Sequence, residues 1–240
     1  MRRGAYTGTG RTAHAPYVAA IALAAILALI GFWPTYFGKL LNGSVETTRL
    51  IHVHAVVQVV WLALFAVQVG LVATGRVALH KKLGTWLMAH AVVVVCVGVA
   101  MSFETAGRYV AAGDIARGQR FLFNFLREVL LFAACVAAGW AYRSKPQAHK
   151  RLMIVAATVV VVPAIGRMTF LGTPPSLVVF MLVWPLPVYV AMLHDYVTKR
   201  LIHPAYVTGV LAMLAERLVL PFGRTETWSA MSAWFVPFYQ

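Results

Sequence analysis

Long apolar runs separated by short polar breaks dominate the pattern of residues along this chain. A helix needs about 20 apolar residues to cross the hydrocarbon core of a bilayer, and six runs come close to that length. Several of them are rich in valine, which in a soluble protein would favour strands. Inside a membrane only helices and closed barrels satisfy the backbone, and no run alternates as a barrel strand does, so we expect helices. The predicted spans are residues 17–33, 51–74, 85–103, 121–142, 152–170 and 177–197.

A seventh apolar run, residues 207–220, contains Glu216 and Arg217. It either crosses the membrane with these charges shielded inside the bundle or lies in the interface. The expected fold is therefore an all-α, polytopic transmembrane helix bundle of six or seven spans. We expect one integral membrane domain over residues 1–240, with a tail at 1–16, six spans within 17–197, and the weaker helix and a second tail at 198–240.

Prolines lie within two of the predicted spans. A proline inside a helix lacks the amide hydrogen, and its ring collides with the carbonyl one turn earlier. We therefore expect the fifth span to kink near Pro163 and the sixth near Pro185 and Pro187.

Composition agrees with a membrane protein and argues against a nucleic-acid-binding one. Charged residues make up 12% of the chain, about half the usual share of a soluble domain. The 21 basic residues exceed the seven acidic ones and leave a net charge of +14. These bases do not form one face or tail, but lie in small clusters between apolar runs, as in polytopic membrane proteins. Binding of nucleic acid is therefore excluded as the reason for the charge.

The distribution of these clusters predicts an orientation. Cytoplasmic loops of membrane proteins carry an excess of lysine and arginine. With the N-terminus in the cytoplasm, 12 basic residues fall on the inner segments and six on the outer loops. We expect a multi-pass protein of the plasma membrane with a cytoplasmic N-terminus.

Two polar breaks resemble each other in register. The segment "GRVALHKKLG" at 75–84 and the segment "SKPQAHKRLM" at 144–153 each follow one apolar run and open the next. When His80 is aligned with His149, basic residues coincide at several further positions, Lys82 with Arg151 among them. This repeat of helix, basic turn and helix covers the second and third spans and then the fourth and fifth. Both histidines should enter the membrane at one depth, on two helices that run the same way.

Two histidines in this arrangement suit bis-histidine ligation of haem b. The iron needs two neutral imidazoles that approach from opposite faces, between facing helices. Nearby bases would neutralise the haem propionates at the membrane surface, and Lys81, Lys82, Lys150 and Arg151 are the candidates. The alternative is that histidine and lysine only add to a positive inner loop.

The same residues carry a resemblance to known proteins. The pattern "LHKKLG" plus "HAVVVV", then "GWAYRSKPQAHKRLM", resembles a group of uncharacterised bacterial membrane proteins with paired HK or HR turns. More distantly, residues 50–200 resemble the transmembrane haem b cytochromes, including the ascorbate-linked family with ligands on four central helices. The resemblance implies electron transfer in a bacterial plasma membrane. In that family the helices supply two ligand pairs, whereas the fourth predicted helix here has Asn124, Arg127 and Glu128 but no histidine, which puts a second haem in doubt.

Further histidines lie inside the predicted spans. His90 follows His80 by nearly three helical turns and is a rival haem ligand; alternatively, it bonds to a carbonyl of a neighbouring helix. His54 shares a helical stripe with Gln58, Trp61 and Phe65, which makes it an inward-facing candidate for cofactor binding. His52 lies about 200° around the helix from His54, so the two cannot face one site. Without a clear third ligand we expect no metal apart from haem iron.

A polar cluster is expected near the outer side. Arg127 and Glu128 are adjacent, and one of them should pair with His54, Gln58 or Arg167. Such a cluster receives an electron donor, a quinone or an anionic head group, or it forms a structural polar lock between helices, which we favour.

Three functions remain open at this stage. The first is a haem b protein that transfers electrons or senses redox state, partnered by lipid and by a redox partner, a quinone or a larger membrane complex. The second is a cofactor-free accessory or scaffold subunit of such a complex. The third is an enzyme acting on a lipid or quinone at the outer cluster.

Overall fold

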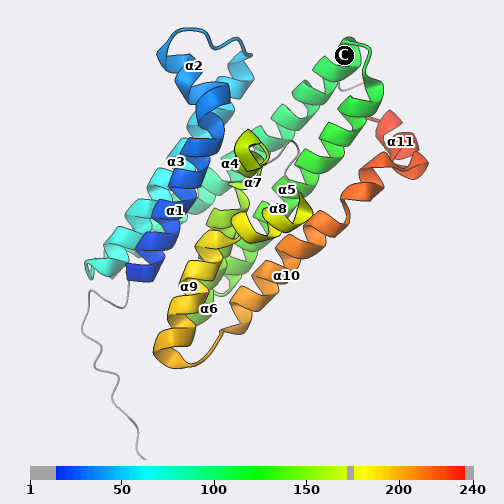
Figure 1. Cartoon of the computed structure of the whole chain (residues 1–240). Helices are drawn as coiled ribbons and strands as arrows, with labels where there is room; N and C mark the ends of the chain where they lie inside the picture. Colours follow the sequence, from blue (N-terminus) through cyan, green and yellow to red (C-terminus); the bar gives the residue numbers. More distant parts are fainter. Residues whose placement is uncertain (1–14, 172–175, 236–240) are drawn as a thin grey trace, which may run out of the picture.

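The computed structural model describes residues 15–171 and 176–235 and forms an elongated bundle of helices (Figure 1). It is 85% helical, and the described residues contain no strand, which confirms the all-α prediction. The elements are α1 (Ala15–Phe32), the π-helical turn η1 (Trp33–Phe37), α2 (Gly38–Leu41), α3 (Arg49–Ala73), α4 (Val77–Ala111), α5 (Ile115–Ala141), α6 (Pro146–Val159), α7 (Val162–Ile165), η2 (Thr169–Leu171), α8 (Leu177–Val183), α9 (Leu186–Lys199), α10 (Pro204–Leu218), η3 (Leu220–Arg224) and α11 (Glu226–Ala233).

Length and apolar composition mark the chain as a multi-pass membrane protein. Six helical segments of the described chain are long and apolar enough to cross a bilayer, and the bent pair α8 and α9 would make a seventh. One of the six is Pro204–Arg224, which includes α10. The run predicted as the weakest thus passes as a candidate span by itself, whereas the predicted sixth span passes only as a bent pair of helices.

Prolines produce both breaks where they were expected. The fifth span stops as a regular helix at Val159 and resumes at Val162, next to Pro163. The sixth span bends by 54° between α8 and α9, and Pro185 lies at the bend. A proline cannot donate the hydrogen bond that would continue the helix, so each span divides there.

The charges of α10 are shielded inside the bundle. Glu216 is 6% and Arg217 7% exposed. Arg217 donates to Glu128 of α5 at 2.9 Å, and Arg127 forms an ion pair with Glu216. Two arginines and two glutamates thus neutralise each other between α5 and α10, which supports the first of the two alternatives for this helix.

Close packing brings α10 and α6 together. Gly209 of α10 faces Val155 of α6, and a Cβ atom at residue 209 would collide with the valine side chain. Small residues at such contacts let transmembrane helices approach each other. The completely buried segment of α6 around Val155 consequently forms the centre of the bundle.

Candidate functional site

Two short turns place His80 and His149 at the same end of the bundle. His80 is the fourth residue of α4, and His149 is the fourth residue of α6. Helix α4 begins eight residues earlier than the predicted third span, so His80 lies in the first helical turn rather than before the helix. The centroids of the two imidazole rings are 6.3 Å apart, with 69° between the ring planes. The structure therefore brings together the two histidines that the repeat aligned.

Each ring is held at its Nδ1 atom by a neighbouring helix. Nδ1 of His149 lies 2.8 Å from the carbonyl oxygen of Gly139 in α5. Nδ1 of His80 lies 2.5 Å from the side-chain amide of the buried Gln68 in α3, which also contacts the backbone of Gly84. In the orientation that satisfies the amide, its nitrogen donates to Nδ1 and to the carbonyl oxygen of His80, and its oxygen accepts from the backbone N–H of Gly84 at 3.0 Å. The Nε2 atom of His149 has no hydrogen-bond partner in the described part of the chain.

Both rings line one cavity, which we call the His-pair cavity. Its volume is about 1030 Å³, at the upper end of the usual range of roughly 300–1,000 Å³ for ligand sites. Gly84 lies one turn after His80, and the space where its Cβ atom would be is open. Apolar side chains of three helices make up most of the wall: Phe65, Val69, Val72, Leu87, Met88, Met153 and Ile154.

The bases of this cavity differ in part from those expected. Lys81 and Lys150 line it as predicted, and Arg143 joins them. Lys82 is exposed and does not line the cavity. Arg151 is 3% exposed and points away from it, toward Asp195 of α9. The sequence did not identify Arg143 as a cavity residue, because there it is one of several basic residues in a loop.

Arg151 belongs to a separate ion-pair cluster. Its Nε atom donates to Asp195 at 2.8 Å, and Nζ of Lys199 lies 2.5 Å from the other carboxylate oxygen. Because α9 is distant in sequence from α6, no local pattern identifies this partner. Arg151 therefore anchors α6 to α9 and is not available to the cavity.

His90 also lies outside the His-pair cavity. Its Nε2 atom is 3.0 Å from the carbonyl oxygen of Val57 in α3. Ten residues rotate a helix by about 280° beyond two full turns, so His90 points about 80° away from His80. The structure thus favours the alternative reading of His90 as a histidine bonded to a neighbouring helix.

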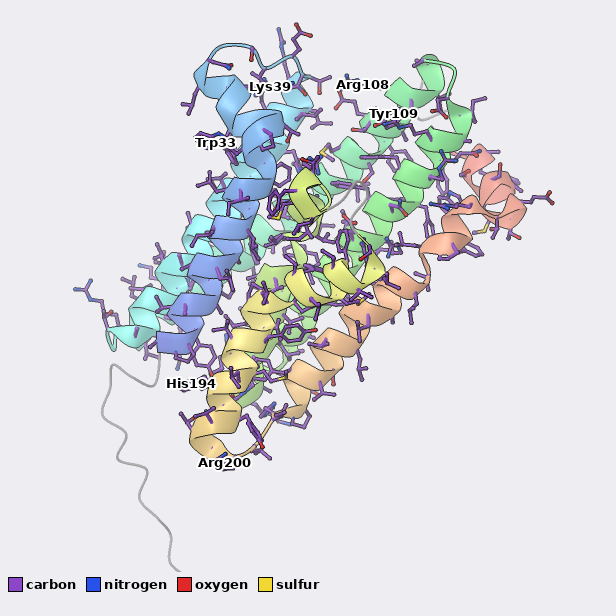
Figure 2. The ribbon with its side chains drawn as sticks, viewed as in Figure 1. Trp33, Lys39, Arg108, Tyr109, His194 and Arg200 are labelled. Carbon is purple, nitrogen blue, oxygen red and sulfur yellow. The ribbon has the colours of Figure 1, made fainter. Side chains whose placement is uncertain are left out.

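A second cavity lies nearer the opposite end, and we call it the His54 cavity. Its volume is about 340 Å³, and His54, Gln58, Glu128 and Arg167 are among the polar residues that line it. Figure 2 labels Lys39 and Tyr109, which also line it, at the end away from His194 and Arg200. His54 faces inward as the stripe predicted but away from the histidine pair.

His52 confirms the angular argument from the sequence. Its Nδ1 atom lies 2.9 Å from the hydroxyl group of Tyr36, and His52 does not line the His54 cavity. The two histidines of α3 therefore face different sides of the helix, as their spacing of two residues requires.

The outer polar cluster divides into two parts. Arg127 and Glu128 pair with Glu216 and Arg217 of α10, not with His54, Gln58 or Arg167, which corrects that prediction. The sequence left this partner undetermined because α10 was not assigned to the bundle. The expected polar lock is present, but it joins α5 to α10.

Arg167 stands apart from the lock. Its Nη1 atom donates to the carbonyl oxygen of Pro163 at 2.8 Å, and its guanidinium group lies 4.7 Å from the centre of the Phe32 ring. It forms no ion pair with a carboxylate of the described residues.

The described residues contain no group of three or more histidine, cysteine, aspartate or glutamate side chains placed to hold a metal ion. The chemistry of the His-pair cavity is therefore that of two imidazoles, an apolar wall and three bases. Comparison with protein-family models, with curated proteins and with solved structures finds no match for this chain.

Proposed function

We propose that this chain is a b-type haem membrane protein that transfers electrons or senses redox state, with His80 and His149 as the side chains that would hold the iron. The spacing of the two rings is the observation that carries the proposal. A metal–imidazole bond is about 2 Å long, so two imidazoles that hold one iron must lie close together. The centroids of the two rings are 6.3 Å apart.

The surroundings of the two histidines suit this group. A ligating histidine usually donates its other ring nitrogen to a carbonyl or similar acceptor, and the carbonyl of Gly139 has that position at His149. At His80 the Gln68 amide nitrogen donates to Nδ1, so the amide would turn its oxygen to that atom when His80 binds iron through Nε2. The open space above Gly84 allows a flat macrocycle to pass close to α4 beside His80. When bound, haem would supply one-electron redox chemistry, and the chain would hold its iron and exclude water with the apolar wall.

The bases suit the two propionate groups. Lys81, Arg143 and Lys150 line the cavity near the polar turns that end α3 and α5. Amine and guanidinium groups bind carboxylates at such a boundary. We further propose that this end of the bundle faces the cytoplasm of a bacterial cell, because the excess of basic residues follows the positive-inside pattern.

An absorption spectrum of the detergent-purified protein, oxidised and then reduced, tests the proposal. The protein should be made with ample haem and show the sharp bands of a six-coordinate b haem. The variants H80A and H149A should lose this spectrum. H90A is the matched control on α4 and should keep it, since His90 bonds to Val57.

Two results would contradict haem binding at this site: a colourless protein that is folded, or an unchanged spectrum in H80A/H149A. Either would favour a cofactor-free accessory subunit of a membrane complex. One observation is consistent with that second function, because the two imidazoles already make an edge-to-face contact with each other.

A further inference from the structure

Buried polar atoms of the His54 cavity lack partners. Nδ1 of His54 and Oε1 of Gln58 are both inaccessible and form no hydrogen bond in the described part of the chain. Buried polar groups in folded proteins are normally paired, so each exception needs an explanation. Both residues line the cavity from one face of α3, so a small rotation of each side chain would present these atoms to a ligand.

A cation adds to this set. Arg167 lines the same cavity, and beyond the carbonyl of Pro163 it has no oxygen partner among the described residues. The arginines of the lock differ, because Arg127 pairs with Glu216 and Arg217 pairs with Glu128. Arg167 has Glu128 only as a more distant opposite charge, and it lies two residues after the candidate span Pro146–Ile165. A charged residue at that position is a candidate functional group. Its remaining donors suit an oxygen atom of a ligand.

Aromatic rings shape the cavity wall. Phe121 and Phe125 stack with centroids 5.5 Å apart and planes only 16° from parallel, and Phe125 meets the His54 ring at 6.0 Å. Tyr109 lies 5.8 Å from Phe121. Aromatic faces stack well with other flat rings. This wall therefore favours a planar head group.

The cavity also reaches the outside of the bundle. Val59 lines it and is 48% exposed on α3, within a candidate membrane span. An apolar tail can thus leave the cavity toward the acyl chains of the bilayer. Two acidic residues, Glu46 and Glu128, and two basic ones, Lys39 and Arg167, line the cavity, so a neutral head group suits it.

We propose that the His54 cavity binds a quinone. One carbonyl oxygen of the quinone would accept from Arg167 and the other from Nδ1–H of His54 or the amide nitrogen of Gln58, and the ring would lie against Phe125. Oε1 of Gln58 would accept from a hydroxyl group of the reduced quinol. The volume of about 340 Å³ suits one head group with the start of its tail. The two cavities are separate. The ring centroid of Trp61 lies 5.0 Å from that of Phe132, which lines the His54 cavity, and 6.2 Å from that of Phe65, which lines the His-pair cavity.

Equilibrium binding of decylubiquinone and of a short-chain menaquinone analogue to the purified protein in lipid nanodiscs tests this inference. Loss of one hydrogen bond to a buried ligand corresponds to about tenfold in affinity, and loss of a charged one to more. We expect H54L and R167M to weaken binding by at least about tenfold. H52L is the matched control and should bind normally, because His52 bonds to Tyr36 instead.

One further variant, a competing lipid and a haem-free control complete the experiment. Q58L alters one neutral group and serves if H54L or R167M does not fold, and it should also weaken binding. Oleate tests whether the cavity takes any lipid. The inference would be overturned if oleate bound as tightly as the quinones, or if H54L, R167M and Q58L bound quinone as tightly as the wild type. The haem-free variant H80A/H149A should still bind quinone, so failure of the haem proposal and failure of this one are distinguishable.

Discussion

The buried carboxylate of Asp195 offers a quantitative test of the fold around the histidine pair. Asp195 is 1% exposed and accepts from two guanidinium nitrogens of Arg151, which is itself 3% exposed. The change D195A removes the counter-ion and leaves the guanidinium buried, with Gln147 as its remaining polar side-chain partner at 2.9 Å.

The expected loss follows from this burial. Breaking a buried ion pair by removing one member costs about 3–5 kcal/mol, because an uncompensated charge remains inside. Lys199 also contacts Asp195 at 2.5 Å, but its side chain is 31% exposed and can turn to solvent. Its pair should contribute only about 0–1 kcal/mol. K199A is therefore the matched control on the same carboxylate.

A double-mutant cycle measures the effect directly. The free energy of unfolding is obtained by titrating the protein in mixed micelles with a denaturing detergent, for the wild type, D195A, K199A, D195L, R151M and D195L/R151M. The single changes should each destabilise by several kcal/mol and the double change by much less, because no unpaired charge is left. Equal losses for D195A and K199A, or additive losses in the cycle, would refute the burial argument.

Three further predictions concern the two ends of the bundle. G84L should abolish haem incorporation while the protein still folds, because its side chain enters the open His-pair cavity; G70L, which meets equally open space away from the cavity, should leave the haem spectrum unchanged, and loss in both variants would contradict this. Q68L should weaken haem affinity about 10–100-fold by releasing the ring of His80, as measured by haem titration of the apoprotein; an unchanged affinity would show that Gln68 does not orient the ligand. Reporter fusions to the two termini should report opposite sides of the membrane, because seven crossings separate them if α8 and α9 form one span; two reporters on the same side would favour an even number of crossings.

Much of the architecture is readable from the sequence because it depends on local properties. Apolar length predicted the spans, and the missing amide hydrogen of proline predicted the breaks near Pro163 and Pro185. The repeat placed His80 and His149 in equivalent turns, and their meeting follows from two similar hairpins packed side by side. The position of His52 away from His54 follows from helical rotation alone.

The site is harder to predict from the sequence, because helices in a membrane are apolar on both faces. In a soluble helix the polar face marks the solvent side, so periodicity identifies the buried face. In a bilayer the lipid-facing and bundle-facing residues are both apolar, and that contrast is lost. The sequence therefore did not show that His90 turns toward Val57.

Long-range pairing is the other part that needed the tertiary structure. The sequence by itself determined that helices form, where prolines break them, and that two histidines recur in one register. Only packing decided that Arg151 meets Asp195 and that the charges of α5 meet those of α10. The energy of an ion pair depends on the distance between the two charges in space. For residues far apart along the chain, the sequence does not show that distance.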